Sequence, residues 1–349
     1  MQFSHGAGCG CKIAPNVLNE ILQSNEKAYP SENLLVGNES RDDAAVFDLG
    51  NGTAVISTTD FFMPVVDDPY DFGRIAAANA ISDIYAMGGK PLMAIAILGW
   101  PVEKIAVEHA QKVISGGRTI CSEAGIPLAG GHSIDSPEPI FGLAVTGLVS
   151  LQNLKRNNTA KEGDLLFLTK PLGVGIVSTA QKRGLGKKED VESMVKQMSA
   201  LNKIGEQLGE IKGVNAMTDI TGFGLLGHTI EIAEGSGLSA EIYYDRILVA
   251  SGVRDYISQR IFPDATTRNW NSYSSKVKFE KPVNVMEAFT LLPDPQTNGG
   301  LLVSVEAGSV KQVQELFNRE GLPGHTEPIG KLYVGEPGKI VVVNGPTNI

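Results

Sequence analysis

Residues 44–62 read AAVFDLGNGTAVISTTDFF, and this stretch decides how the fold begins. Two runs rich in β-branched and aromatic residues lie on either side of Asn51-Gly52. An Asn-Gly dipeptide readily takes up the positive φ angles of a tight turn between two strands. The stretch therefore predicts a β-hairpin.

The pattern of apolar residues changes directly after this hairpin. Segment 71–89, DFGRIAAANAISDIYAMGG, carries apolar residues at helical spacing and stops at Gly88-Gly89, which predicts a buried helix. An apolar run at 91–100, a helical stretch from about 102 to 124, a short segment at 128–135 and a strand-like run at 139–150 follow. The order ββαβαβ favours an α+β fold.

The second half of the chain repeats this mixture after a polar linker at 151–164. A strand, a Gly-rich turn and a helix are predicted at 164–180, and the same succession is predicted at 214–237. LPDPQTNGGLLVSVE, at 292–306, has the pattern of a loop that enters a strand. We therefore expect a second mixed domain.

Length and charge limit the classes of protein to consider. With 349 residues the chain suits two domains of roughly 100–200 residues each. A formal net charge of −9 and the lack of a long Lys/Arg cluster argue against a nucleic-acid partner. No basic leader is followed by an apolar run, and no stretch approaches the roughly 20 apolar residues that span a bilayer. We expect a cytoplasmic protein without a membrane partner.

Two common nucleotide-binding motifs receive little support. The sequence contains no GxxxxGK[ST] phosphate loop. GFGLLG at 222–227 matches GxGxxG, but it follows a short polar stretch and not a clear βαβ unit. A nucleotide site must therefore use other residues, with metal ions between an acidic protein and a polyphosphate.

Aspartates recur at the boundaries of the expected elements. They are Asp42, Asp43, Asp60, Asp83 and Asp219. Because magnesium takes oxygen ligands and keeps waters and substrate phosphates, a few carboxylates from different elements suffice for an ATP site. Turn or cap roles remain the alternative for Asp42 and Asp60. Asp83 shares a polar stripe with Asn79 and Ser82 on an apolar helix, where an ionised carboxylate seldom lacks a partner.

The run LAGGHSID at 128–135 allows two interpretations. Gly130 and Gly131 would let backbone N–H groups approach a phosphate, with side-chain contacts from His132 and Ser133. A plain tight turn fits the pattern equally well.

The N-terminal run GAGCGCK, at 6–12, places two of the three cysteines of the chain beside Lys12. Metal capture by His5, Cys9 and Cys11 is one interpretation, although a zinc site usually has four ligands and a wider spacing. A redox pair is the second, although thioredoxin-like motifs place two residues between the cysteines. The third is nucleophilic delivery, since a nearby lysine favours the thiolate and glycines let the arm fold over a nucleotide.

Several motifs occur together and in order: HGAGCGCK, GNESRDDAAVFDLGNGTAVISTTDFF, LAGGHSID with EPIFGLAVTG, AMTDITGFGLLGH and DPQTNGGLL. Over nearly the whole chain they resemble the selenophosphate synthetase, or selenide, water dikinase, family. The resemblance implies two mixed α/β-sandwich domains of the aminoimidazole ribonucleotide synthetase-like fold, preceded by a flexible Gly/Cys-rich arm. One departure is Asn298, where the family has a small serine.

The resemblance also implies a role for each matching residue. Cys9 and Lys12 match the essential residues of the arm, and Asp43, Asp83 and Asp219 match the magnesium ligands. The implied nucleotide contacts are Lys12, Ser40, Arg41, Asp42, Asp60, Asp83, Gly131, His132 and Ser133. The implied reaction converts ATP, selenide and water into selenophosphate, AMP and phosphate, with Mg²⁺.

The resemblance further divides the chain into three parts. Residues 1–37 are expected to form the arm and its lead-in, 38–152 an ATP- and Mg-binding dimerisation domain, and 160–349 the C-terminal domain. The implied assembly is a homodimer through the N-terminal domains. Two alternatives are a kinase or ligase of the same fold with a carbon substrate, and a non-catalytic nucleotide- or metal-binding module.

Overall fold

The computed structural model describes residues 31–37 and 42–346, together with residues 1, 4, 6–11, 17, 20 and 21. For Cys9 and Cys11 it describes the backbone only. The predicted site residues Lys12, Ser40 and Arg41 lie outside the described residues.

The first sheet is formed by strands from residues 34–150. These are β1 (Leu34–Val36), β2 (Ala45–Asp48), β3 (Thr53–Phe62), β4 (Lys90–Trp100), β5 (Leu128–Asp135) and β6 (Ile140–Ser150). Their order is β1-β2-β3-β6-β4-β5, with only the β4–β5 pair parallel. The predicted hairpin is confirmed as β2 and β3. Segment 128–135, which was not predicted as regular structure, is edge strand β5, and β1 lies within the segment expected as a lead-in.

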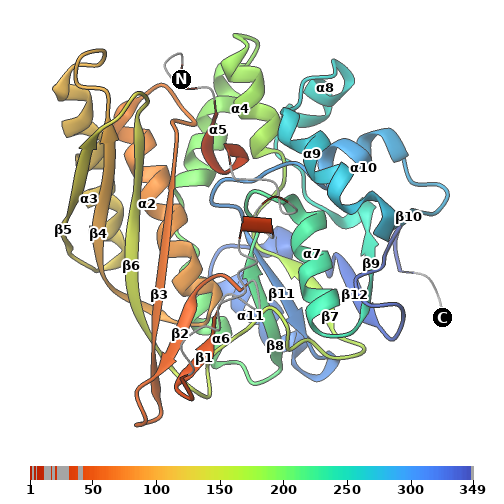
Figure 1. The fold of residues 1–349 in the computed structure, drawn as a ribbon. Helices are drawn as coiled ribbons and strands as arrows, with labels where there is room; N and C mark the ends of the chain where they lie inside the picture. The colour runs from red at the N-terminus through yellow and green to blue at the C-terminus, as the bar shows by residue number, and fades with distance from the viewer. Residues whose placement is uncertain are drawn as a thin grey trace.

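Two helices cover one face of this sheet (Figure 1). They are α2 (Pro69–Ala86) and α3 (Val107–Ala124). A Cβ atom added at Gly73 would overlap the carbonyl oxygen of Val113, and one added at Gly116 would overlap that of Tyr70. Helix α2 also faces the second domain and is buried along almost its whole length, which explains its continuous apolar sequence.

The second sheet uses residues 165–343. Its strands are β7 (Leu165–Leu168), β8 (Val214–Asp219), β9 (Ser239–Tyr243), β10 (Val277–Phe279), β11 (Leu301–Val305), β12 (Gly330–Tyr333) and β13 (Ile340–Val343). They lie in the order β10-β13-β9-β12-β7-β11-β8, with parallel and antiparallel pairs. Both domains are thus mixed, and the predicted α+β class is confirmed.

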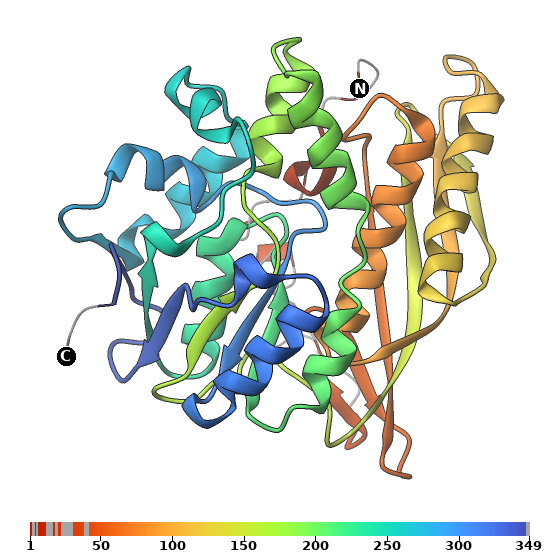
Figure 2. The ribbon, with the colours of Figure 1, turned by 180° about the vertical axis from the view of Figure 1, so that it is seen from behind.

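The helices of the second half surround this sheet (Figure 2). They are α4 (Val174–Lys182), α5 (Lys188–Ser199), α6 (Ile204–Glu210), α7 (Gly224–Gly235), α8 (Val253–Ser258), α9 (Asp264–Tyr273), α10 (Val285–Leu291) and α11 (Val310–Arg319). One apolar core runs through both halves, from Ile56 and Ile84 to Ile176 and Leu226. Among the described helices, none is long and apolar enough to cross a membrane.

Candidate functional site at the domain junction

Three predicted metal ligands come from elements that meet at the junction of the two domains. Asp43 lies two residues before β2, the first strand of the hairpin, Asp83 lies on α2, and Asp219 ends β8. The hydroxyl of Thr218 donates to Oδ1 of Asp43 at 2.8 Å, a bond between the two domains.

The hydrogen bond between Asp43 and Thr218 connects residues that are 175 positions apart in the sequence. The junction therefore exists only in the folded chain.

Burial and mutual repulsion shape the carboxylates at this junction. The pKa of Asp43 is raised well above its ordinary value, first because the group is buried and next because the charges of Asp219, Asp42 and Asp83 lie near it. Oδ2 of Asp43 is buried and accepts no hydrogen bond from the described residues. Asp219 is 1% exposed and Asp83 is 7% exposed. Such a group of carboxylates favours the binding of a cation.

The carboxylates do not form a closed metal cage by themselves. Within the ranges that the structure describes, no three His, Cys, Asp or Glu side chains are close enough to hold a metal ion. This agrees with the chemistry of magnesium, which is usually bound through one or two carboxylates, several waters and substrate phosphates. The alternative of metal capture by His5, Cys9 and Cys11 lies outside the described side chains.

The polar stripe predicted on α2 connects the first sheet with the second domain. The amide of Asn79 donates to Oδ2 of Asp60 at 2.5 Å, and its oxygen accepts the backbone N–H of Asn298 at 2.7 Å. Asp83 accepts a hydrogen bond of 2.5 Å from the hydroxyl of Thr58. Ser82 accepts one of 2.8 Å from Asn202. Each polar residue of the stripe thus has a partner, as the sequence predicts for such a setting.

The family departure at Asn298 has a local explanation. Asn298 has a φ of 48°, in the left-handed region that asparagine tolerates better than most residues. Its side-chain amide donates to the carbonyl oxygens of Met198 and Ala200 at 2.6 and 2.9 Å. The Asn298 side chain therefore stabilises the loop, while its backbone N–H donates to Asn79.

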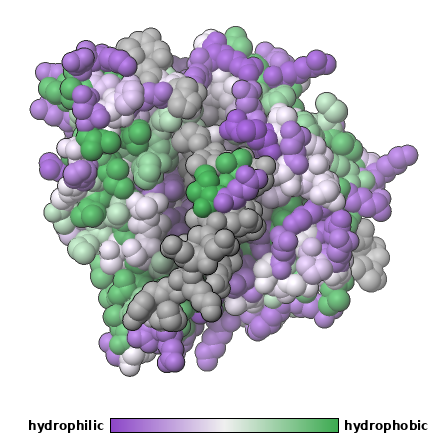
Figure 3. Space-filling view, in the orientation of Figure 1, coloured by the Kyte–Doolittle hydropathy of each residue, from purple (hydrophilic) through white to green (hydrophobic). Residues whose placement is uncertain are grey.

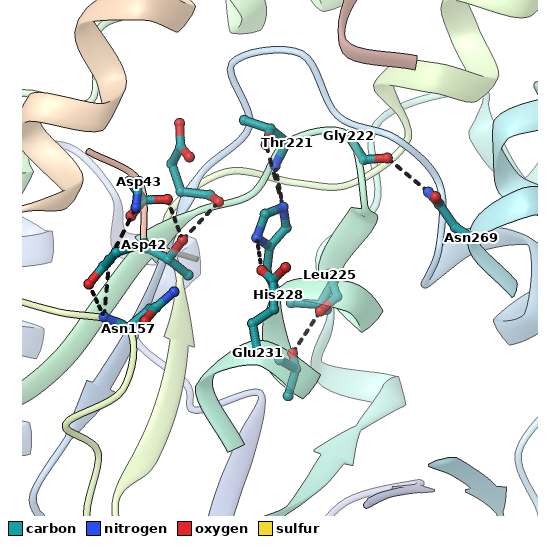
Figure 4. A network of polar contacts seen from close by, with 12 residues as sticks. Asp42, Asp43, Asn157, Thr221, Gly222, Leu225, His228, Glu231 and Asn269 are labelled. Atoms are coloured by element: carbon teal, nitrogen blue, oxygen red, sulfur yellow. Dashed lines mark hydrogen bonds and ion pairs between the residues drawn. The ribbon is translucent and has the colours of Figure 1, made fainter. Parts of the chain in front are cut away.

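Asp42 differs from its neighbour, because its carboxylate binds backbone amides (Figure 4). Oδ1 of Asp42 accepts the N–H groups of Asp43 at 3.1 Å and Asn157 at 3.3 Å. Burial nevertheless raises the pKa of Asp42 to about 7, with smaller opposing effects from these donors. These bonds favour the turn-forming role that the sequence left open for Asp42.

A histidine fixes the turn that follows Asp219. Nε2 of His228 accepts the backbone N–H of Thr221 at 3.1 Å, and Nδ1 lies 2.9 Å from a carboxylate oxygen of Glu231 (Figure 4). With Nε2 accepting, the ring proton lies on Nδ1 and faces Glu231. His228 is thus a packed, hydrogen-bonded residue and not an open ligand.

Lys170 is a site residue that the sequence analysis missed. Its buried ammonium group donates to the carbonyl oxygens of Ala200 and Asn298 at 2.8 and 2.9 Å. Burial lowers the pKa of Lys170 to about 7, and the charge of Asp219 partly opposes that shift. The TKPLG sequence around it gives no local signal, because all these partners are distant in sequence.

The predicted nucleotide contacts at residues 131–133 lie at a distance from the aspartates within one chain. Gly131, His132 and Ser133 lie on the exposed edge strand β5. The register aligns Asp60 with Leu143, Leu143 with Ala96, and Ala96 with Gly131. Three strand spacings separate Asp60 from Gly131, which is about 14 Å. Gly131 does not form a tight turn, but its backbone lies so close to Ala96 that a Cβ atom would overlap the Ala96 carbonyl oxygen.

The cysteine-bearing segment lies beside the same junction. Residues Gly8–Cys11 form the short 3-10 helix η1, and the N–H of Gly8 donates to the carbonyl oxygen of Met63 at 3.1 Å. A Cβ atom at Gly8 would overlap Oγ1 of Thr297, the residue before Asn298. Gly8, the residue before Cys9, therefore packs against Thr297, and the next residue, Asn298, contacts the α2 stripe.

Family models and relatives agree with this architecture. The AIR synthase related protein N-terminal domain matches residues 41–149, and the AIR synthase related protein C-terminal domain matches residues 161–343. The chain is 55% identical over 342 residues to the selenide, water dikinase of Cronobacter sakazakii, covering 98% of this chain and 96% of that protein. It is 56% identical over 341 residues to the selenide, water dikinase of Haemophilus influenzae strain KW20, with coverages of 98% and 97%.

A solved structure with low sequence identity has the same fold. The hydrogenase maturation protein HypE in complex with ATP superimposes with a TM-score of 0.66 at 17% identity, covering 89% of this chain and 86% of that chain. The likeness shows the fold alone, whereas the identities above 50% extend over almost the full length of both relatives. The chain therefore belongs to the selenide, water dikinase family of the AIR synthase related proteins.

Proposed function

We propose that this chain makes selenophosphate from ATP, selenide and water, and releases AMP and phosphate. The observation that carries the proposal is the group of neighbouring carboxylates of Asp43, Asp83 and Asp219 at the domain junction. The Thr297-Asn298 segment at this junction contacts both η1 and α2. Family membership supports the same reaction, since both close relatives are named for it.

Magnesium is the metal that suits the junction best. The available ligands are carboxylate oxygens, and Asp43 has a buried oxygen that accepts no hydrogen bond from the described residues. Burial, together with repulsion from the neighbouring carboxylates, raises the pKa of Asp43. We propose that Asp43, Asp83 and Asp219 hold the metal together with phosphate oxygens of ATP. A metal held by these carboxylates would supply positive charge to offset the charge that develops on the transferred phosphoryl group.

The chain's own residues orient the reactants. Asn79 fixes the Asp60 carboxylate, which we propose as a nucleotide contact, and Thr58 fixes Asp83. His228 holds the turn after Asp219 through Thr221. Because phosphoryl transfer depends chiefly on positioning and on electrostatic stabilisation, this fixed arrangement favours an in-line attack on ATP. The proposals for Lys12, Ser40, Arg41 and the 131–133 run rest on the sequence motifs.

Cys9 and Lys12 supply the step that distinguishes this reaction from an ordinary kinase. Selenide is soft and easily oxidised, so a soft thiolate on a closing arm suits its delivery. Lys12 favours the thiolate form of a neighbouring cysteine and adds a positive charge for the phosphates. Such thiol chemistry needs a reducing compartment such as the cytoplasm.

The reaction is tested by incubating the protein with Mg-ATP and anaerobic selenide and following the products by phosphorus NMR. We expect AMP, phosphate and a phosphorus signal split by selenium, all dependent on selenide. Release of ADP without dependence on selenide would favour a kinase with a carbon substrate. ATP binding with no turnover would favour a non-catalytic module.

We also propose a homodimer through the first sheet. The face opposite α2 and α3 exposes the apolar side chains of Phe47, Phe61, Ile95 and Ile134, each between 43% and 59% exposed. Figure 3 shows apolar side chains gathered over this part of the molecule. The edge of β5 is also exposed along its length. Such a face and such an edge favour association with a second copy.

Sedimentation over a range of concentrations tests this assembly. We expect the parent to sediment as a dimer and Ile95→Glu to sediment as a monomer, because a charge would be buried in the interface. Leu185→Glu is the matched control, since Leu185 is a 55% exposed apolar residue of the second domain and should not alter assembly. A monomeric parent at micromolar concentration would contradict the proposal.

A further inference from the structure

Helix α9 contacts three parts of the candidate site through two adjacent side chains. The guanidinium of Arg268 donates to the carbonyl oxygen of Gly10 at 2.9 Å. The buried amide of Asn269 donates to the carbonyl oxygens of Gly222 at 2.8 Å and Pro293 at 3.0 Å (Figure 4 shows the first). Gly222 lies three residues after Asp219, and Pro293 begins the 293–298 loop. One helix thus contacts η1, the turn after Asp219 and this loop.

The 293–298 loop forms a firm surface against which η1 packs. Oε1 of Gln296 accepts the N–H groups of Gly173 and Val174, at 3.3 and 3.2 Å. Oδ2 of Asp294 accepts the N–H of Gly175 at 3.1 Å and the side-chain amide of Gln296 at 2.8 Å. Asp294 and Gln296 are fully buried, so the start of α4 holds the loop in place.

Two glycines of η1 approach this surface differently. Gly8 has a φ of 49°, and a Cβ atom there would overlap Oγ1 of Thr297. A Cβ atom at Gly10 would lie 3.7 Å from Cγ of Pro295, an ordinary van der Waals distance. Close approach therefore requires glycine at position 8 and not at position 10.

We propose that Arg268 is a positioning residue that holds the cysteine-bearing η1 helix against the 293–298 loop. Through its neighbour Asn269, the same helix fixes the turn after Asp219, so α9 aligns the arm with the proposed metal ligands. Arg268 lies outside the carboxylate group and acts on the η1 backbone, 2.9 Å from the Gly10 oxygen. The effect of this alignment on turnover rests on the proposed role of Cys9, whereas the docking itself does not.

Hydrogen exchange tests the docking directly. In Arg268→Ala we expect the amides of residues 6–11 to exchange about tenfold faster, because a hydrogen bond from a charged donor is lost. Thr267→Ala controls for the helix, since Thr267 is the exposed neighbour of Arg268. Arg118→Ala, at an exposed arginine of α3, controls for the loss of one charge. Unchanged exchange in Arg268→Ala, or equal acceleration in both controls, would overturn the proposal.

Kinetics separate positioning from a merely structural role. We expect Arg268→Ala to lower kcat for selenide-dependent AMP formation at least about tenfold, with Mg-ATP affinity within twofold of the parent. Arg268→Lys should regain part of kcat, because an ammonium group can still donate to the Gly10 carbonyl. A parallel loss of Mg-ATP affinity would instead show that α9 only stabilises the domain. If exchange accelerates but kcat does not change, docking stands and the proposed role of Cys9 fails.

The glycine pair gives a second and independent test. We expect Gly8→Ala to raise exchange of residues 6–11 to the level of Arg268→Ala, since the side chain would meet Thr297. Gly10→Ala should retain slow exchange, because its added methyl group has room. Slow exchange in Gly8→Ala, or equally fast exchange in both variants, would contradict the docked arrangement.

Discussion

The aspartates and the η1 segment that carries the cysteines both lie where the two domains meet, but the protein holds them in different ways. Asp83 and Asp219 belong to a long buried helix and to a sheet strand, and their exposed fractions are 7% and 1%. The arm is held through main-chain atoms, with the Gly8 N–H bonded to Met63 and the Gly10 oxygen bonded to Arg268. The first region belongs to core elements, whereas the second is attached to its neighbours through main-chain hydrogen bonds.

This difference indicates that nucleotide binding and selenium handling can be separated. Residues that are fixed by the core stabilise a charged nucleotide complex without moving. A segment that is attached through main-chain hydrogen bonds can open at lower cost than a core helix or strand, as a part that must admit and enclose reactants requires. We therefore expect nucleotide binding and selenium handling to respond independently to substitution.

The largest effect should come from the aspartates. We expect Asp43→Asn, Asp83→Asn and Asp219→Asn each to weaken Mg-ATP binding by about tenfold to a hundredfold, because each removes a hard anionic ligand. Titration calorimetry measures this, and EDTA should mimic it in the parent. Glu192→Gln, at a surface pair with Lys188, is the charge-matched control. If one of these variants binds and turns over Mg-ATP like the parent, the aspartate that it lacks has only a structural role.

A smaller effect is expected on the arm when nucleotide binds. We expect the amides of residues 6–11 to exchange several-fold more slowly with Mg-ATP, since their glycines bury little apolar surface by themselves. The Asp43→Asn variant should lose this protection at the same nucleotide concentration. Equal exchange with and without Mg-ATP would mean that the arm does not close in response to nucleotide.

A prediction about stability and not about ligand binding concerns Lys155, which joins the linker to the second domain. Its ammonium group donates to the carbonyl oxygens of Ile211 and Val214, at 3.1 and 2.9 Å, and burial lowers its pKa to about 8. Between pH 8 and about 10.5 the unfolded chain binds more protons than the folded one, so this lysine makes stability rise with pH. The slope is at most about 1.4 kcal/mol per pH unit.

Lys155→Met should remove that rise. It should also lower the free energy of unfolding by a constant amount, because the carbonyl oxygens of Ile211 and Val214 lose their donor. Urea unfolding at several pH values between 7 and 10.5 measures the difference between parent and variant. A constant difference over this range would show that Lys155 titrates in the folded protein as it does in the unfolded chain.

Local patterns predicted the parts of the fold that have local causes. The Asn51-Gly52 turn specifies the hairpin, and the apolar spacing up to Gly88-Gly89 specifies α2. Asp83 could be singled out because a carboxylate in an apolar helix needs a partner. That partner, Thr58, lies on the predicted hairpin.

The rest depends on contacts between distant residues. Strand β5 contains Gly130 and Gly131, which hide its extended character, and its pairing with β4 comes from the register of the sheet. No local pattern marks Arg268 or Lys170, since each finds its partners only after both domains have folded. The segment 239–291, with α9 between short strands, was not predicted for the same reason.

The central claim is that the aspartates bind the nucleotide while Cys9 handles selenium. The most direct measurement is selenide-dependent AMP release in Cys9→Ser and Cys11→Ser, assayed anaerobically beside Mg-ATP affinity. We predict that Cys9→Ser loses turnover to background but binds Mg-ATP like the parent, because a serine hydroxyl is hard and weakly acidic, and that Cys11→Ser stays active. A fully active Cys9→Ser enzyme, or equal inactivation at both cysteines, would contradict the account.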